Sequence, residues 1–290
     1  MSPVVQKLRR KAALLWTESP QGIWSKVVHR FHPAETRDSE AHVWCLSTGR
    51  VGTATLTALG ELSTDVLSEH EPTPLLFGLG KHAYEATSDG QDDPILREAV
   101  LTCRRNVPQN GQRVYLETSP EVTFVARQLG HAFPSSRFIH VVRHPVAVIR
   151  SGMRRGWYDG HANDNWRITP TADEMSIRDW QALTAFEKNV WSWAATNRWI
   201  LEFTQSIPVE KSLLLKSEDL YSGSGQVATR FFDFLGVQQP PKKRIQRVLG
   251  QKINAQQQGD FPKFDEWSES QKETLKRVAG EVMDQLGYQV

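Results

Sequence analysis

A short glycine-containing segment near the start of the chain has the residue types that bind anions. Residues 47–55 read Ser-Thr-Gly-Arg-Val-Gly-Thr-Ala-Thr and separate an apolar run from a helical pattern. At such a turn, backbone N–H groups and the positive end of the helix dipole point towards an anion. Gly49 and Gly52 permit left-handed backbone, and Thr53 and Thr55 supply hydroxyls. The segment therefore predicts a phosphate-type site, with a plain strand-to-helix turn as the structural alternative.

The segment differs from the phosphate loop of ATP-hydrolysing enzymes. Their pattern, Gly-x-x-x-x-Gly-Lys-Ser/Thr, places a lysine directly after the second glycine. Here the cation is Arg50, which precedes Gly52, and no lysine occurs between Val51 and Glu61. A kinase-like ATP enzyme is therefore disfavoured, and it stays open as the alternative enzymatic interpretation.

A second group of cations lies much further along the chain. Residues 137–155 contain five arginines and no acidic residue. Arg143 ends an apolar run, Pro145 suits the first turn of a helix, and Ser151 follows two turns later. If the strand end and the helix fold over one ligand, Arg143 and Ser151 face it together, and arginine suits the fork-like binding of phosphate. A strand followed by a solvated arginine helix is the structural alternative.

Short apolar runs and helical patterns alternate around these two segments. The predicted strands are 42–47, 65–69, 114–117, 138–142 and 213–216, and the predicted helices are 53–62, 93–106, 121–133, 146–155, 177–205 and 226–235. Alternation of this kind indicates βαβ units and a parallel sheet. We expect one α/β domain over 1–290, a P-loop NTPase-like parallel sheet of about five strands flanked by helices. A helical extension over 1–40 and a C-terminal flap and helix over 240–290 complete it.

Composition and charge exclude several classes of function. The 290 residues carry 35 Lys and Arg against 33 Asp and Glu, a net charge of +2, which disfavours nucleic acid as the main partner. Cys45 and Cys103 are too few for a disulfide framework or a zinc cage, which indicates a reducing, cytoplasmic compartment. No apolar run approaches the ~18–20 residues that span a bilayer. The basic segment 1–16 is interpreted as a solvated helix, with peripheral membrane contact as the alternative.

Taken together, the motifs resemble those of sulfotransferases that use 3′-phosphoadenosine 5′-phosphosulfate (PAPS). Residues 50–53, Arg-Val-Gly-Thr, match the family's 5′-phosphosulfate loop, and Arg143 with Ser151 matches its 3′-phosphate site. Residues 214–220 and 231–237 are similar to its later Glu-Asp-Leu and Phe-Leu-Gly segment. The match is closest to the bacterial and Golgi-type branches. It implies transfer of a sulfonate group from PAPS to an acceptor hydroxyl or amine, with 3′,5′-adenosine bisphosphate (PAP) as the product.

The resemblance also implies which residues bind the donor. They lie in the loop, in the arginine-rich segment and in a C-terminal flap: Arg50, Val51, Gly52, Thr53, Ala54, Thr55, Arg143, Ser151, Arg155, Asn254 and Lys263. The reaction needs no metal. His29 and His32 have possible ligand spacing, but no cysteine and few acids lie nearby, and His140 and His144 straddle a strand end and do not share a helix face. We therefore interpret both pairs as structural.

In-line transfer requires a cation at the departing oxygen and a base for the acceptor's proton. Arg50 is the predicted cation. Glu71 follows the second predicted strand, whose carboxyl end opens onto the ligand crevice of an α/β sheet. The resemblance implies a Glu or a His at that place, so Glu71 is the preferred base and His70 the second. Glu117, at the end of another predicted strand, is the third, unless it pairs with an arginine.

The aromatic residues fall into two groups. Residues 156–166 mix two tryptophans and a tyrosine with hydrogen-bonding side chains, which suits a sugar or another polar ring. Trp180, Trp191, Trp193 and Trp199 follow a helical pattern and are expected in the core. We therefore expect a small-molecule or glycan acceptor, a carbohydrate or glycolipid hydroxyl. A nucleotide-binding module without catalysis is the non-enzymatic alternative.

Overall fold

The structure, a computed structural model, describes residues 41–86, 93–104, 112–222, 225–251, 253 and 259–289. The predicted extension over 1–40, with His29 and His32, lies outside the described residues, and so does Asn254. All described elements belong to one compact unit, Ser39–Val290.

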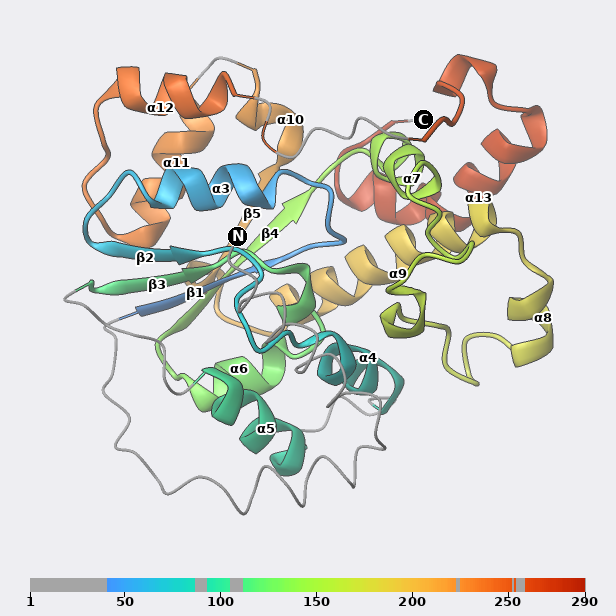
Figure 1. Cartoon of the computed structure of the whole chain (residues 1–290), viewed down its shortest axis with the longest axis horizontal. Coiled ribbons are helices and arrows are strands. Elements are labelled where there is room, and N and C mark those ends of the chain that lie inside the picture. The colour runs from blue at the N-terminus through green and yellow to red at the C-terminus, as the bar shows by residue number, and fades with distance from the viewer. Residues whose placement is uncertain are drawn as a thin grey trace, which may run out of the picture. The chain divides into compact units, whose positions relative to one another are not determined.

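Five parallel strands form one sheet, as the alternating pattern predicts. In sheet order they are β2 (Val66–Glu69), β3 (Val114–Glu117), β1 (Ala41–Leu46), β4 (Ser136–Val142) and β5 (Ser212–Lys216). Each observed strand lies within one or two residues of its predicted bounds. The α/β class with a parallel sheet of about five strands is confirmed (Figure 1).

The loops that follow β1 and β4 leave the centre of the sheet in opposite directions. The two strands are neighbours, paired in parallel from His42 opposite Ser136 to Leu46 opposite His140. The chain leaves β1 for β2 at one edge and leaves β4 for β5 at the other edge. Open α/β sheets bind ligands at such a switch point, outside the carboxyl ends of the strands. Both predicted anion-binding segments begin there.

Helices cover both faces of the sheet (Figure 1). The α-helices among the described residues are α3 (Thr53–Gly60), α4 (Phe77–Ala86), α5 (Pro94–Arg104), α6 (Ala126–Ala132), α7 (Pro145–Met153), α8 (Ile177–Ala182), α9 (Ala185–Gln205), α10 (Ser217–Leu220), α11 (Gln226–Leu235), α12 (Lys242–Leu249) and α13 (Glu269–Gln285). Four short 3-10 helices join them: η1 (Pro120–Val122), η2 (Asp164–Trp166), η3 (Val209–Lys211) and η4 (Phe264–Glu266). No helix in the described part of the chain is long and apolar enough to cross a membrane.

Two long predicted helices are each divided in the structure. The pattern at 121–133 contains η1 and α6, and the pattern at 177–205 contains α8 and α9. The second division falls at Thr184, whose hydroxyl accepts the Glu187 N–H while the Glu187 carboxylate accepts the Thr184 N–H. This reciprocal cap starts a new helix. The helices α4 and α12 were not predicted.

The core divides by strand face. Along β1, Val43 and Cys45 belong to one hydrophobic cluster, and Trp44 and Leu46 belong to the other. Successive side chains of a strand point to opposite faces, so β1 supports both layers of helices. The expected core tryptophans are confirmed: Trp180, Trp191 and Trp193 are buried, and Trp199 is partly buried.

Candidate functional site

The segment after β1 forms a tight loop with three residues in the left-handed region. Gly49, Arg50 and Gly52 have φ values of 75°, 61° and 92°. Thr123 anchors the loop, because its hydroxyl accepts the Ser47 N–H at 3.0 Å and donates to the Ser47 carbonyl at 3.1 Å. Gly52 then caps α3. The Thr55 N–H donates to the Gly52 carbonyl at 2.9 Å, so the N–H groups of Thr53 and Ala54, the first of α3, are the ones left to face the space in front of the loop.

The two predicted anion-binding segments meet in front of this loop. Arg50 donates from Nε to the Ser151 hydroxyl at 3.1 Å, and Arg143 donates from Nη1 to the Arg50 carbonyl at 3.2 Å. Trp193 of α9 holds the strand end in place by donating to the Arg143 carbonyl at 3.0 Å. Burial lowers the pKa of Arg50, and the charges of Arg155 and Arg143 lower it further. Such a cluster of cations favours an anion.

One cavity of about 1110 Å³ connects most of the predicted site residues. Those that line it are Arg50, Gly52, Thr53, Ala54, Thr55, His70, Glu71, Arg143, Ser151 and Arg155. The cavity lies at the carboxyl ends of the strands, where the switch point predicts it.

Two residues predicted for the donor do not line the cavity. Val51 is 1% exposed and packs in the hydrophobic core, so only its backbone follows the loop. Lys263 is exposed at the start of η4, where its N–H donates to the Glu266 carboxylate. The C-terminal wall of the cavity is formed instead by residues 249–251 and Ile253. The sequence therefore indicated the neighbourhood of this wall but not its residues.

His70 and Glu71 lie side by side directly after β2. The His70 Nδ1 is 2.9 Å from the carbonyl oxygen of Thr118, which can only accept, so Nδ1 carries a proton. His70 Nε2 is 3.8 Å from Glu71 Oε1. Glu71 has a φ of 50°, an uncommon value for a residue with a side chain. The pair presents a carboxylate and an imidazole to the cavity.

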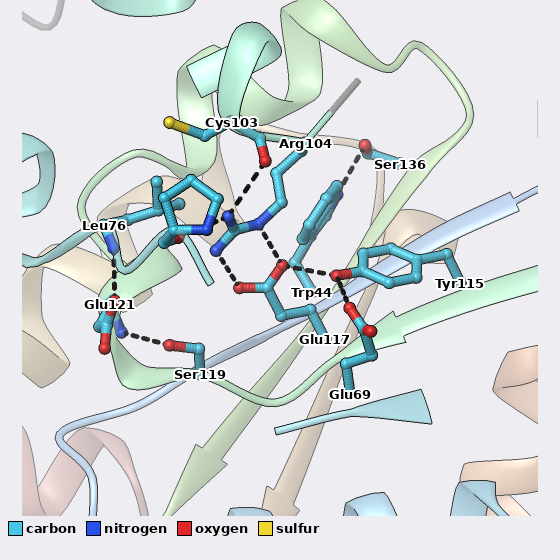
Figure 2. A network of polar contacts seen from close by, with 11 residues as sticks. Trp44, Glu69, Leu76, Cys103, Arg104, Tyr115, Glu117, Ser119, Glu121 and Ser136 are labelled. Atoms are coloured by element: carbon cyan, nitrogen blue, oxygen red, sulfur yellow. Dashed lines mark hydrogen bonds and ion pairs between the residues drawn. The ribbon is translucent and has the colours of Figure 1, made fainter. Parts of the chain in front are cut away.

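Glu117 is a buried structural carboxylate. Arg104 holds it through two hydrogen bonds, Nε to Oε2 at 2.7 Å and Nη2 to Oε1 at 2.8 Å, and the Tyr115 hydroxyl donates to Oε2 at 2.9 Å (Figure 2). The Glu117 side chain is 0% exposed and does not line the cavity. Because Glu117 pairs with an arginine, it is no longer a candidate for the base. Glu71 and His70 remain.

Glu121 lines the cavity, although sequence reasoning did not select it. Its Oε2 accepts the Leu76 N–H at 2.5 Å, and its buried Oε1 has no hydrogen-bond partner (Figure 2). Burial raises the pKa of Glu121 to about 8. In the sequence this glutamate stands at the start of a helical pattern, and nothing in that pattern distinguishes it from a solvated residue.

The aromatic loop at 156–166 reaches the same cavity. Trp157, His161 and Trp166 line it, as does Arg167 directly after the loop. The Arg167 guanidinium lies 4.0 Å from the centroid of the Trp157 ring. The loop therefore supplies indole faces and hydrogen-bond donors opposite the anion-binding segments.

The histidines near β4 are structural, as expected from their spacing. His140 is buried and hydrogen-bonded to Asn197 at 2.9 Å, and burial lowers its pKa to about 4. His144 packs its ring against Tyr288. Within the described ranges, no group of three or more His, Cys, Asp or Glu residues is placed to hold a metal ion.

A parallel sheet with an anion-type loop at its switch point defines this chain as an α/β protein with P-loop-like architecture. A family model described as "Sulfotransferase family" matches residues 61–241, more than half of the chain. The chain therefore belongs to the sulfotransferase family. No curated protein matches its sequence significantly.

Solved sulfotransferase structures have a similar fold at low sequence identity. The sulfotransferase domain from the curacin biosynthetic pathway is 17% identical, with a TM-score of 0.54, over 86% of this chain and 98% of that domain. The domain from the olefin synthase of Synechococcus PCC 7002 is 17% identical, with a TM-score of 0.49, over 89% and 100%. Mouse sulfotransferase SULT7A1 complexed with PAP is 13% identical, with a TM-score of 0.46, over 86% and 85%. The first of these similarities supports the fold.

Proposed function

We propose that this chain transfers a sulfonate group from PAPS to a hydroxyl of an acceptor. The observation that carries the proposal is the contact between the two anion-binding segments, Arg50 with Ser151 and Arg143 with Arg50, inside one cavity. PAPS has a phosphosulfate at the 5′ position and a phosphate at the 3′ position of one ribose. A ligand with two anionic ends matches two adjacent clusters of donors.

This match favours one orientation of the donor in the cavity. The N–H groups and hydroxyls of residues 52–55 would bind the 5′-phosphosulfate at the start of α3. Arg143 and Ser151 would bind the 3′-phosphate. Residues 249–251 would cover the adenosine from the C-terminal side. The family assignment supports this arrangement, because the matched residues 61–241 include Arg143 and Ser151.

The transfer step follows from the same arrangement. The acceptor oxygen forms a bond to sulfur while the bond from sulfur to the bridging phosphate oxygen breaks, and that oxygen leaves with PAP. Arg50 neutralises the charge that develops on the bridging oxygen. The acceptor's proton passes to the Glu71 carboxylate, whose charge reaches Arg50 across the cavity. His70, whose Nε2 faces Glu71, is the second candidate for this proton.

The residues of the aromatic loop, which would bind the acceptor, favour a compound that has a ring and a hydroxyl. Trp157 and Trp166 provide apolar faces, and the polar side chains between them provide hydrogen bonds. We infer a small molecule or a glycan, with a carbohydrate or glycolipid hydroxyl as the preferred substrate.

Donor binding is tested by thermal unfolding with PAP and, separately, with ATP and Mg²⁺. PAP at a hundred times its Kd should stabilise the protein by about 2.7 kcal/mol. Arg143→Ala should abolish this stabilisation, while Arg178→Ala, which removes an exposed arginine of α8, should leave it intact. Preference for ATP with Mg²⁺ would instead support a kinase-like enzyme, and PAP binding without transfer to any acceptor would support a non-catalytic module.

The base is tested by Glu71→Gln. This variant should bind PAP as the wild type does and lose ~10²–10⁴-fold in kcat, because it keeps the shape and removes the proton acceptor. Glu210→Gln, an exposed change on η3, is the matched control. Unchanged turnover in Glu71→Gln would move the role to His70.

A further inference from the structure

The cavity holds more positive charge than its proposed donor site uses. Seven arginine and lysine side chains line it, against the two carboxylates Glu71 and Glu121. The pKa of Glu121 is raised to about 8 by burial, so this carboxyl is mostly protonated at neutral pH. Arg50 and Arg143 belong to the proposed donor site. The roles of the other five cations in the cavity therefore have to be explained separately.

Three of the remaining cations already have partners. Arg150 and Arg154 donate from Nε to carbonyls of the C-terminal segment, Phe261 and Gly259 respectively, each at 2.9 Å. Lys81 donates to the Asn165 carbonyl at 3.1 Å and pairs with a glutamate one turn along α4. These contacts hold the cavity walls together.

Arg155 has no such partner. Its Nε is buried and makes no hydrogen bond, and no described residue forms an ion pair with its guanidinium. Its charge lowers the pKa of Arg50 on one side and the pKa values of His161 and Arg167 on the other. Arg155 follows α7, which carries Ser151, and directly precedes the aromatic loop, and all three line the cavity, so Arg155 lies between the proposed donor site and that loop. A buried donor without an acceptor is costly unless a ligand satisfies it.

Arg167 is fixed in position and still has hydrogen-bond donors that no described residue uses. Its guanidinium stacks on Trp157 at 4.0 Å, and its Nε donates to Asp164 at 3.0 Å. Asp164 also accepts the N–H groups of Tyr158 and His161, so it fixes the loop as well as the arginine. The two terminal nitrogens of Arg167 make no hydrogen bond to any described residue. Arginine positioned through Nε in this way offers its outer edge to a second anion.

His161 adds a neutral donor beside the two arginines. Its Nδ1 accepts the Asn163 N–H at 3.1 Å, so the proton of the neutral ring is on Nε2. Burial, followed by the charge of Arg167, lowers the pKa of His161 and keeps the ring neutral. Two guanidinium groups and one imidazole N–H thus lie beside the indole rings of the acceptor end.

We propose that Arg155, Arg167 and His161 bind an anionic group carried by the acceptor itself. The group is a carboxylate, sulfate or phosphate attached to the ring or chain that bears the reacting hydroxyl. This inference rests on the proposed sulfonate transfer and adds the charge of its second substrate. It also assigns Arg155 to the acceptor, whereas the resemblance implied a donor residue at that position.

The test compares matched acceptors that differ in one charge. Methyl glucuronide is paired with methyl glucoside, and 4-hydroxybenzoate with 4-hydroxybenzyl alcohol, each with radiolabelled PAPS. A charged hydrogen bond contributes about 1.5–3 kcal/mol, so kcat/KM should favour the charged member of at least one pair by roughly 10- to 100-fold. Calorimetry of the same compounds with PAP-saturated protein measures the preference without turnover.

Variants then assign the preference to residues. Arg155→Gln and Arg167→Gln should each reduce the preference towards parity and keep the thermal stabilisation by PAP. Lys81→Gln, which removes a cavity cation that is already paired, should change neither. Equal turnover and equal binding of charged and neutral compounds by the wild type would overturn the proposal, and so would loss of PAP stabilisation in Arg155→Gln. Absence of PAP binding in the wild type would instead overturn the proposed function.

Discussion

The buried ion pair between Arg104 and Glu117 allows a quantitative test of what supports the site. Their side chains are 2% and 0% exposed and are joined by two hydrogen bonds of 2.7 and 2.8 Å. Glu117→Gln keeps the shape of the side chain and removes its charge. The guanidinium then stays buried without a counter-charge, which costs about 3–5 kcal/mol in the free energy of unfolding.

The same ion pair helps to position the proposed catalytic residues. Arg104 also donates from Nη1 to the Pro74 carbonyl at 2.8 Å, which ties the loop after β2 to the end of β3. That loop carries His70 and Glu71. We therefore expect Glu117→Gln to lower kcat in addition to stability, although Glu117 does not line the cavity.

A double variant separates the loss of charge balance from the loss of contacts. Arg104→Met with Glu117→Leu removes both charges, so no uncompensated ion remains. The Pro74 and Cys103 carbonyls lose a donor, and the Tyr115 hydroxyl keeps Glu69 as its acceptor. The double variant should therefore be less destabilised than Glu117→Gln. Urea unfolding followed by circular dichroism measures both. A free energy of unfolding within 1 kcal/mol of the wild type in Glu117→Gln would refute the reasoning.

Two further predictions concern the cavity walls. The pKa of Glu121 is raised from 4.5 to about 8, so the folded state favours the protonated carboxyl. The stability that this preference gives is fully present below about pH 4.5 and is lost as the pH rises through 8. Thermal unfolding from pH 5 to 9 should show a steeper fall for the wild type than for Glu121→Gln, by up to about 5 kcal/mol, and equal slopes would contradict it. Gly52→Ala should abolish stabilisation by PAP, because its φ is 92° and a Cβ would lie 3.3 Å from Leu220. Gly160→Ala, with a φ of 87° and open space around it, should retain that stabilisation, and equal losses in the two variants would trace the effect to backbone strain alone.

The sheet could be predicted because its signal is local. The central strands β3, β1 and β4 are short apolar runs buried on both faces, the edge strands β2 and β5 are partly buried, and loops with glycine, proline or polar residues bound them. The helices were predicted less completely. The cap at Thr184 is readable as a Thr-x-x-Glu pattern, but the hydrophobic period continues across it. Helix α4 contains two glycines, which weaken a helical pattern, and α12 is short, with only three apolar residues, Ile245, Val248 and Leu249, in its eight.

The candidate site, like the fold, could be predicted only where its signal is local in the sequence. Arg50, Arg143 and Ser151 could be selected because each stands at a strand end or at a fixed spacing after one. The role of each glutamate could not be predicted, because Glu71 and Glu117 both stand at strand ends and differ only in their tertiary partners. Arg104, which buries and neutralises Glu117, lies on α5, and Leu76, which binds Glu121, lies before α4. Burial and pairing of this kind depend on contacts between elements, which a strand pattern does not contain.

The net charge of +2 conceals how unevenly charge is placed. Seven cations line the cavity, but Lys81 pairs with Glu85, Arg167 pairs with Asp164, and Glu71 opposes one more, so with Glu121 mostly protonated the surplus at neutral pH is about four positive charges. PAPS carries about four negative charges, two on the phosphosulfate and nearly two on the 3′-phosphate. The donor therefore matches the whole surplus, and the acceptor end is distinguished by its unused hydrogen-bond donors rather than by net charge. Arg155 and Arg167 are the cavity cations that have neither a proposed donor contact nor a full set of partners among the described residues. The hydrogen-bond donors that PAPS leaves unmatched thus lie beside the aromatic loop, where an anionic group of the acceptor would accept from them.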